Sequence, residues 1–476
     1  MRVALPLLAL AGCAACGSDR VTADAAPGDT AVDATPVDVV DAIDSDAVSD
    51  DADSADAAPS DDVTLRAAVA IPGKLVAVRV DAPEPRSDTV SIGATQVRLH
   101  RGRGVVTTRP EDAPELHLAT RAWDAATDLR IDGERVVAAG ETLTIAAGTR
   151  VLMGKDARLV VDGTLVAAGS EAAPILFTPD AEPWAAIEIH AGGKATLTDV
   201  WLVGGGADND RFGGHSGSDP VVAAIGGEVA MSGGGIVDAA GKALYTEGAT
   251  VGLDGVTIAR CDTGGEHVES HVTMRHGFTF EIPDADGSFD DDDNDCIYLR
   301  LGTGVIEDSV FATGEDDAID HNGAELEVRR VFIDGMHHEG IATSTGGAVT
   351  IEDATILHCN QGIEAGYGAP AVSVTRAFVS GCGVGFRWGD EYDWEALGTL
   401  TVDHSVALGN DVGVKTDDPQ QGEAPVGAVA ITCSAVATAA WDAVGGNIAD
   451  VPAVDGVCPP ALSACDATLG PASCAP

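Results

Sequence analysis

The chain contains 476 residues, with 76 acidic and 27 basic side chains, and its formal net charge at pH 7 is -49. Such a charge repels phosphate backbones and therefore excludes nucleic acid as a partner. It fits a protein that binds cations or stays soluble by self-repulsion. The length allows one large repeat domain or two to three ordinary domains.

The first residues have the layout of a secretory signal: Arg2, a short apolar run, and small residues that end at a cysteine. The run is too short to span a bilayer as a helix. Leu10-Ala11-Gly12-Cys13 resembles the lipobox of bacterial lipoproteins, in which the signal is cut before the cysteine and the cysteine is acylated. Residues 1–18 are therefore interpreted as signal and lipobox, and Cys13 as the lipid anchor of an exported protein at the outer membrane or cell surface. An ordinary cleaved signal with an incidental cysteine is the alternative.

Two further segments precede the main part of the chain. Residues 19–62 consist almost only of Ala, Asp, Val, Ser, Thr and Pro, so they repel one another and have little to bury. We expect a disordered acidic linker that lifts the folded part off the membrane. Residues 63–128 contain short alternating runs, LVAVRV and TQVRLH, without a regular period, which predicts a small β domain or a cap.

A repeat of strand-like segments follows, in two sets that share nearly the same spacing. The first set recurs at steps of 22 to 28 residues and is centred on Ile297, Ile319, Ile341, Ile363, Phe386 and Val414. The second set is centred on Ile306, Val328, Ile351, Val374, Val402 and Ile431. A leucine-rich repeat has a similar period, but these segments are rich in Val, Ile and Thr and lack helical spacing between them. The pattern predicts an all-β, right-handed, single-stranded parallel β-helix, because each coil then supplies backbone partners to the next.

The segment Leu143 to Ile189 looks like the opening coils of bacterial surface proteins of the parallel β-helix repeat family. The similarity is carried by the Gly163-Thr164-Leu165 turn and by the Pro174 to Thr178 run before Trp184. It implies a β-helix over residues 129–437, followed by a cysteine-containing cap over residues 438–476. It says little about function, because this fold carries lyases, hydrolases, adhesins and inert scaffolds.

The eight cysteines after Cys16 allow disulfides in an exported chain. Cys359 and Cys382 occupy the same phase of adjacent coils, within disulfide range, and Cys261 could pair with Cys296. Stacked free thiols are the alternative for both pairs. Four further cysteines are expected to staple the cap: Cys433, Cys458, Cys465 and Cys474.

Carboxylates recur two residues before the first-set positions of three coils, at Asp295, Asp317 and Glu339. They follow the acidic loop DADGSFDDDDNDC, and crowded oxygen ligands suit a hard cation such as Ca2+. The loop lacks the EF-hand pattern, so a solvated acidic turn is the alternative. The predicted calcium ligands are Asp284, Asp286, Asp290, Asp295, Asp317 and Glu339. Zinc held by His337, His338 and Glu339 is disfavoured, because neighbouring residues on a strand face opposite ways.

Three successive coils also resemble the catalytic layout of polygalacturonases, through Asn294-Asp295, Asp316-Asp317 and His338-Glu339-Gly340. The resemblance implies that Asp295 and Asp317 assist the attack of water while Asp316 protonates the leaving oxygen in an inverting hydrolysis. Three departures weaken it. The threonine of the first motif is missing, Glu339 stands where the family has histidine, and no Arg-Ile-Lys follows on the next coil.

A second column holds alternating charges, and its members are Asp308, Arg330, Asp353, Arg376 and His404. Opposite charges one coil apart attract, so this column is interpreted as a structural charge ladder. A polysaccharide lyase that uses Ca2+ and takes Arg330 or Arg376 as its base is a weaker alternative.

Aromatic residues gather in and near the insertion RWGDEYDWEALG, and they are Tyr367, Trp388, Tyr392 and Trp394. Exposed aromatic faces beside carboxylates suit stacking against sugars, although packing beneath their own loop is equally compatible with the sequence. The sequence thus favours a lipid-anchored envelope protein that binds or displays without catalysis, with polysaccharide as the candidate partner and Ca2+ as the candidate stabilising ion. The alternative is a glycan-cleaving enzyme that uses Asp295, Asp316 and Asp317.

Overall fold

The computed structural model describes residues 129–437, apart from 171, 208–210, 213, 283–293, 391, 393, 420 and 433, and the backbone of six further strands. Before residue 129 these strands form two antiparallel pairs, β1 (Val76–Val78) with β4 (Val106–Thr108) and β2 (Pro85–Ile92) with β3 (Thr95–Arg103). After residue 437 they are β42 (Ala453–Val454) and β43 (Thr468–Leu469). Among the described residues no helix is long and apolar enough to cross a membrane.

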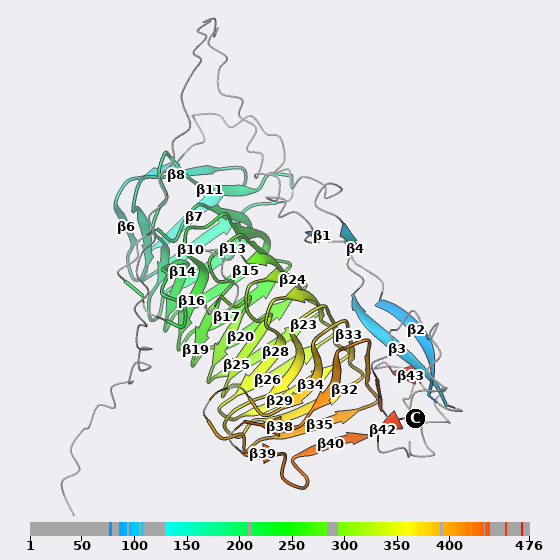
Figure 1. Cartoon of the computed structure of the whole chain (residues 1–476). Helices are drawn as coiled ribbons and strands as arrows, with labels where there is room; N and C mark the ends of the chain where they lie inside the picture. The colour runs from blue at the N-terminus through cyan, green and yellow to red at the C-terminus, as the bar shows by residue number, and fades with distance from the viewer. Residues whose placement is uncertain are drawn as a thin grey trace, which may run out of the picture. The chain divides into compact units, whose positions relative to one another are not determined.

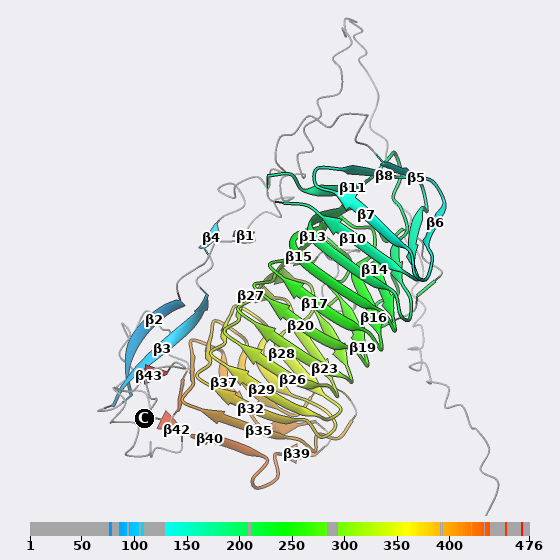
Figure 2. The same cartoon turned by 180° about the vertical axis from the view of Figure 1, so that it is seen from behind.

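The coils have three faces, and each face is a column of parallel strands (Figures 1 and 2). The first face consists of β7 (Thr142–Ala146), β10 (Thr164–Ala168), β13 (Lys194–Val203), β15 (Glu228–Val237), β17 (Thr250–Asp254), β20 (His271–Arg275), β23 (Thr303–Glu307), β26 (Glu325–Arg329), β29 (Ala348–Glu352), β32 (Ala371–Thr375), β35 (Thr399–Asp403) and β40 (Val429–Thr432).

The second face is joined to the first, because the long strands β13 and β15 run around the corner between them. Its other strands are β5 (Leu129–Ile131), β8 (Arg150–Met153), β11 (Ile175–Pro179), β18 (Thr257–Ala259), β21 (Phe278–Ile282), β24 (Val310–Gly314), β27 (Phe332–Met336), β30 (Thr355–Leu357), β33 (Phe378–Ser380), β36 (Val406–Leu408) and β41 (Ser434–Ala437).

The third face is a separate sheet of twelve strands. They are β6 (Glu134–Val137), β9 (Arg158–Val161), β12 (Ile187–Ile189), β14 (Pro220–Ile225), β16 (Lys242–Glu247), β19 (Glu266–Val268), β22 (Tyr298–Arg300), β25 (Ile319–Asn322), β28 (Glu339–Ser344), β31 (Gln361–Ala365), β34 (Val384–Trp388) and β37 (Val412–Lys415). A short hairpin, β38 (Asp417–Asp418) with β39 (Gly422–Glu423), follows it.

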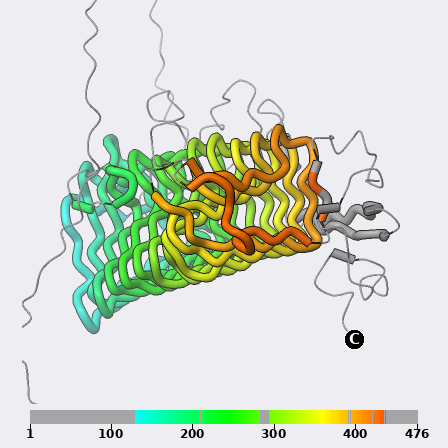
Figure 3. The backbone as a smooth tube through the Cα atoms, turned by 60° about the horizontal axis from the view of Figure 1, so that its bottom comes forward, coloured from blue at the N-terminus to red at the C-terminus, as the bar shows by residue number. Residues whose placement is uncertain are grey.

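The predicted stacking of equal phases is confirmed. On the third face Ile319 pairs with Ile341, Ile341 with Ile363, and Ile363 with Phe386. The second set of positions stacks on the first face in the same order, from Ile306 to Ile431. Figure 3 shows the resulting coils piled along one axis. The chain is a parallel β-helix, whose bore is filled by the buried apolar residues of both sets.

Glycines precede Ile341 and Ile363 of the third face because the interior of these two coils leaves no room for a side chain there. A Cβ atom on Gly340 would lie 2.6 Å from Ile356 Cγ2 and 2.7 Å from the carbonyl oxygen of Gly362, which is closer than real Cβ contacts come. Gly362 meets Val379 in the same way on the next coil. The repeated glycine is therefore a packing requirement of this coil geometry.

The predicted charge ladder lies at the corner between the first and second faces. Its residues adopt left-handed backbone conformations, with φ between 49° and 59°, at Asp308, Arg330, Asp353, Arg376 and His404. This conformation costs an L-residue about 1 to 2 kcal/mol. Two paired contacts offset that cost: Arg330 binds both Asp308 carboxylate oxygens at 2.8 and 3.0 Å, and Arg376 binds those of Asp353 at 2.7 and 3.1 Å.

The four described cysteines are free thiols, so the disulfides predicted for them are wrong. Cys261 Sγ lies 3.6 Å from Ile236 O, whereas Cys296 Sγ lies 4.0 Å from Met336 Sδ, two coils farther on. The two sulfur atoms therefore point to different coils.

Cys359 and Cys382 do lie on adjacent coils, and the Cys359 N–H donates to Cys382 Sγ at 3.4 Å. Each thiol nevertheless donates to a carbonyl of its own coil, on Leu357 and on Ser380. The lipidation and cap predictions fall outside the described residues, at Cys13, Cys433, Cys458, Cys465 and Cys474.

Candidate functional site

The predicted carboxylates stack at the start of the third face. Cys296 N–H donates to the carbonyl of Asp317 at 2.8 Å, and Ala318 N–H donates to that of Glu339 at 3.1 Å, which sets the three coils in register. The side chains also connect the coils. Asp295 Oδ1 accepts the backbone N–H of Asp317 at 3.3 Å, and Asp317 Oδ1 accepts that of Glu339 at 2.6 Å.

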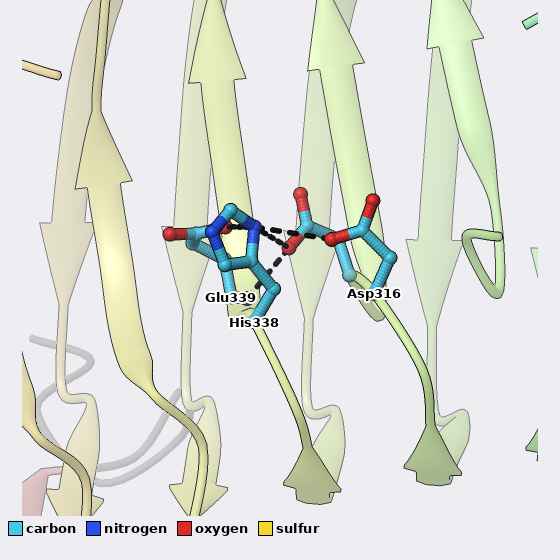
Figure 4. A group of neighbouring side chains, drawn as sticks. Asp316, His338 and Glu339 are labelled. Atoms are coloured by element: carbon cyan, nitrogen blue, oxygen red, sulfur yellow. Dashed lines mark hydrogen bonds and ion pairs between the residues drawn. The ribbon is translucent and has the colours of Figure 1, made fainter. Parts of the chain in front are cut away.

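A cluster of four residues forms the centre of the site: Asp316, Asp317, His338 and Glu339. Figure 4 shows three of them, Asp316, His338 and Glu339, on adjacent coils. His338 Nδ1 lies 3.0 Å from Asp316 Oδ1 and 3.7 Å from Asp317 Oδ1, and it also contacts Glu339 Oε2. The His338 side chain is 44% exposed, whereas those of Asp317 and Glu339 are 7% and 3% exposed. Two buried acids thus lie beneath an accessible Asp316–His338 pair.

His338 reaches this cluster together with Glu339 because it precedes the first residue of β28. The alternation of side chains along a strand therefore does not separate the two. This removes the objection to a metal bound by both residues that the sequence had raised, although His337 does not belong to the cluster.

The protonation of the cluster is divided between its members. Burial raises the pKa of Asp317 well above its usual value, and neighbouring carboxyl groups, Glu339 foremost, raise it further. Burial also acts to raise the pKa of Glu339, but hydrogen bonds with His338 and Asp317 outweigh it and lower that pKa. For His338, burial lowers the pKa, yet hydrogen bonds with Asp316 and Glu339 raise it to about 11. Burial and neighbouring charges thus shift the pKa values of Asp317 and Glu339 in opposite directions, and at neutral pH His338 is an imidazolium.

A second group of donors adjoins the first and includes a residue that the sequence did not single out. His215 Nε2 lies 3.7 Å from Asp320 Oδ2 and 3.9 Å from Asp295 Oδ2. Its ring stacks on Tyr298 with a centroid separation of 4.2 Å and an interplanar angle of 13°. His215 comes from the connection between β13 and β14, outside the repeat, so periodicity gave no signal for it.

Buried polar contacts continue from the cluster into the next coils. Gln361 Nε2 donates to Glu339 Oε1, and Gln361 Oε1 accepts from Arg387 Nη1 at 2.9 Å. Arg387 also lies 3.5 Å from Glu364, and its side chain is only 1% exposed. This arginine supplies a positive charge to the acidic region but cannot reach a ligand.

Three of the four predicted aromatic ligand-binding residues form an exposed cluster. The rings of Tyr367 and Trp394 pack edge to face with their centroids 4.6 Å apart, and the ring centroids of Tyr392 and Trp394 are 6.0 Å apart. Asn322, two residues beyond Asp320 in sequence, donates to the hydroxyl of Tyr367 at 3.1 Å, which ties the cluster to β25.

The prediction for Trp388 is wrong. Its side chain is fully buried in the bore, and its indole N–H donates to Gly398 O at 3.0 Å. Trp388 follows the buried phase of β34, two residues beyond Phe386, and therefore belongs to the core.

Both donor groups have the composition of a cation site. The ligand atoms within each group lie within 4.8 Å of one another, and carboxylate oxygens suit Ca2+ while added histidines suit transition metals. Of the predicted calcium ligands, Asp317 and Glu339 fall in the first group and Asp295 in the second. The others, Asp284, Asp286 and Asp290, fall outside the described residues.

The two arginines considered as lyase bases lie elsewhere, at the corner between the first and second faces. Hydrogen bonding to Asp308 raises the pKa of Arg330. Burial acts to lower the pKa of Arg376, but the hydrogen bond to Asp353 outweighs it and raises that pKa. Both guanidinium groups stay protonated and paired, so neither can act as a base.

No protein-family model matches the chain, and no curated protein sequence matches it. Similar solved structures include an alginate lyase from Paenibacillus sp. str. FPU-7, at 14% identity, covering 60% of this chain and 93% of that chain, with a TM-score of 0.31. The catalytic unit of a GH87 α-1,3-glucanase from Streptomyces thermodiastaticus strain HF3-3 is 13% identical, covering 77% of this chain and 87% of that chain, with a TM-score of 0.42. At these TM-scores the similarities carry no argument about function.

Proposed function

We propose that the protein hydrolyses glycosidic bonds of a polysaccharide at the start of the third face, using Asp295, Asp316, Asp317 and His338. The observation that carries the proposal is the accessible Asp316–His338 pair above two buried acids on adjacent coils. Glycoside hydrolysis requires a proton donor and a proton acceptor on either side of the scissile bond. In the polygalacturonase-like pattern of the sequence, Glu339 stands where that family has a histidine. His338, the preceding residue on the same coil, supplies an imidazole instead.

The proton donor is the Asp316–His338 pair. Its members are 3.0 Å apart and share one proton, and they are the most exposed groups of the central cluster. That proton passes through Asp316 to the glycosidic oxygen as the bond from this oxygen to the anomeric carbon breaks. Water adds its oxygen to the carbon and gives a proton to Asp295, and exchange with solvent then returns the donor and acceptor to their starting states.

Asp317 has a different part in this proposal from the one that its sequence position implied. Because burial and neighbouring carboxyl groups raise its pKa, it is less suited than an ordinary carboxyl group, with a pKa of about 4, to lose its proton and is not assigned as the base. Asp295 is then the carboxylate that accepts the proton of water. Its Oδ1 atom is held by the Asp317 backbone N–H, which fixes its position.

The substrate proposed is a polysaccharide of neutral sugars. Tyr392 and Trp394 are 55% and 58% exposed, and aromatic faces of this kind stack on sugar rings. Arg387, the buried cation that contacts Gln361 and Glu364 beside the cluster, is not accessible to bind the carboxylate of a uronic acid. Hydrolysis thus replaces the non-catalytic binding role that the sequence favoured, whereas the lipid anchor and cell-surface location stay predictions.

The test is release of reducing ends from a panel of neutral and acidic polysaccharides by the full chain. We expect Asp316→Asn and Asp295→Asn each to lower kcat by about 100-fold or more, because each removes one proton-transfer step. Glu327→Gln is the matched control, since Glu327 lies on the first face of the coil that carries Asp316 and pairs with surface Arg329. Absence of turnover by the unaltered protein, together with a melting temperature that rises with Ca2+, would instead support the binding scaffold.

A further inference from the structure

The connection between β13 and β14 is fixed onto the third face by a buried ion pair. Lys242 Nζ donates to Glu266 Oε1 at 2.8 Å and to Ser216 O at 2.9 Å. The Glu266 carboxylate also accepts the backbone N–H groups of His215 at 3.0 Å and Ser216 at 2.6 Å. Both charged side chains are at most 1% exposed. A buried pair of this kind offsets its desolvation cost only when further hydrogen bonds satisfy it, and here the connection supplies them.

Two further contacts fix the same segment. Asp219 accepts the backbone N–H of Phe212 at 2.8 Å, and Arg211 reaches Glu188 at 2.7 Å. Gly214 lies directly against the Lys242–Glu266 pair, where a Cβ atom would overlap Glu266 Oε2. The segment around His215 is therefore held in one place by side chains of three third-face strands, β12, β16 and β19.

This anchoring sets the position of one imidazole ring. His215 stacks on Tyr298, and its Nε2 atom lies between the carboxylates of Asp295 and Asp320, at 3.9 and 3.7 Å. Contacts at catalytic groups are often long before substrate binds and shorten in the complex. A base that is oriented by a third group is a recurring arrangement in hydrolytic sites.

We infer that His215 is a positioning residue for the proton acceptor: its Nε2 atom orients the Asp295 carboxylate toward the attacking water. The buried Lys242–Glu266 pair holds the backbone at His215 and so fixes the position of the ring. This inference rests on the proposed hydrolysis and adds to it a residue from outside the repeat.

The test compares His215→Ala and His215→Gln with the unaltered protein on the polysaccharide that it cleaves. We expect His215→Ala to lower kcat by about 10- to 100-fold with KM changed less than about twofold, as for other supporting contacts of a site. Glutamine keeps a donor near the Nε2 position, so we expect it to restore part of the loss. Glu266→Gln should reproduce the loss, because it weakens the support of the connection.

Oligosaccharide binding separates positioning from substrate contact. In the background of Asp316→Asn, the added change His215→Ala should leave the Kd of a bound oligosaccharide unchanged. A weaker Kd would overturn the inference, and so would full kcat in His215→Ala when the unaltered protein is active. His271→Ala, on the exposed first face, is the matched histidine control, and equal melting temperatures exclude loss of folding. If the unaltered protein cleaves none of the panel, the proposed hydrolysis itself fails.

Discussion

Burial shifts the protonation equilibria of single residues in this molecule away from those in solvent. It raises the pKa of Asp317 beneath the site and lowers that of the interior histidine His267. His267 is fully buried beside Thr246, whose hydroxyl lies 2.8 Å from Nδ1. Burial of this ring lowers its pKa from 6.5 to about 4, because the charged form would lose its hydration. Such shifts link the fold to pH.

Stability should fall as the pH decreases from about 6.5 to about 4, because the unfolded ring binds a proton in this window while the folded ring does not. The contribution of His267 lost across the window is about 3 kcal/mol. His267→Gln should therefore show a shallower pH dependence of the free energy of unfolding, measured by denaturant titration at several pH values. The surface variant His271→Gln should keep the original slope, and an unchanged slope in His267→Gln would contradict the argument.

At the scale of an element, the corner between the first and second faces combines backbone strain with charge pairing. Each coil turns here through a left-handed residue, and alternate coils supply the acid and the base of a pair. The pairs differ in burial, since the Asp353 side chain is 2% exposed and that of Asp308 is 14% exposed. Removing one partner from a buried pair leaves an uncompensated charge, whereas solvent can reach the more open pair.

We expect Asp353→Asn to lower the free energy of unfolding by about 3 kcal/mol, because Arg376 would lose its buried, two-point partner and keep the contact with Glu352 at 3.5 Å. Asp308→Asn should cost about 1 kcal/mol, since Arg330 can also use Glu307 at 3.0 Å. Equilibrium unfolding in urea measures the free energy of unfolding of both variants and of the unaltered protein. Equal losses in the two variants would show that burial does not set the strength of these pairs.

Sequence periodicity predicted the elements more completely than the site. Stacking of equal phases followed from the spacing of residues such as Ile319 and Ile341, because a fold built of equal coils repeats its buried positions. The carboxylate column followed for the same reason. His215 could not be predicted, since it lies in an irregular connection and reaches the site through tertiary contacts. Trp388 and the cysteines were misassigned because spacing alone does not reveal the direction in which a side chain points.

On the scale of the whole molecule, each coil contacts chiefly its two neighbours, so stability accumulates along the stack. The middle coils are covered on both sides, and β28 and β31 are almost entirely buried. Near the end of the described stack, β37 and β40 are more exposed. Within the described stack, the site at Asp295 to Glu339 therefore lies in a more protected part than the coils of β37 and β40.

Hydrogen–deuterium exchange read by mass spectrometry should reflect this gradient. Backbone amides of β25, β28 and β31 should exchange at least roughly tenfold more slowly than those of β37 and β40, because opening the middle requires disruption of coils on both sides. Because both groups of strands are measured in the same sample, the exchange of one group is the control for the other. Uniform exchange along the stack would mean that the whole repeat opens as a single cooperative unit.

The nearest-neighbour construction also bears on how such a chain can evolve. A winding duplicated or deleted between β32 and β41 would leave the three windings that carry the carboxylates, and the connection that carries His215, with the same neighbours. The length of the β-helix can therefore change by gain or loss of whole coils without a change in the residues of the site. Selection can tune how far the protein extends separately from what it does.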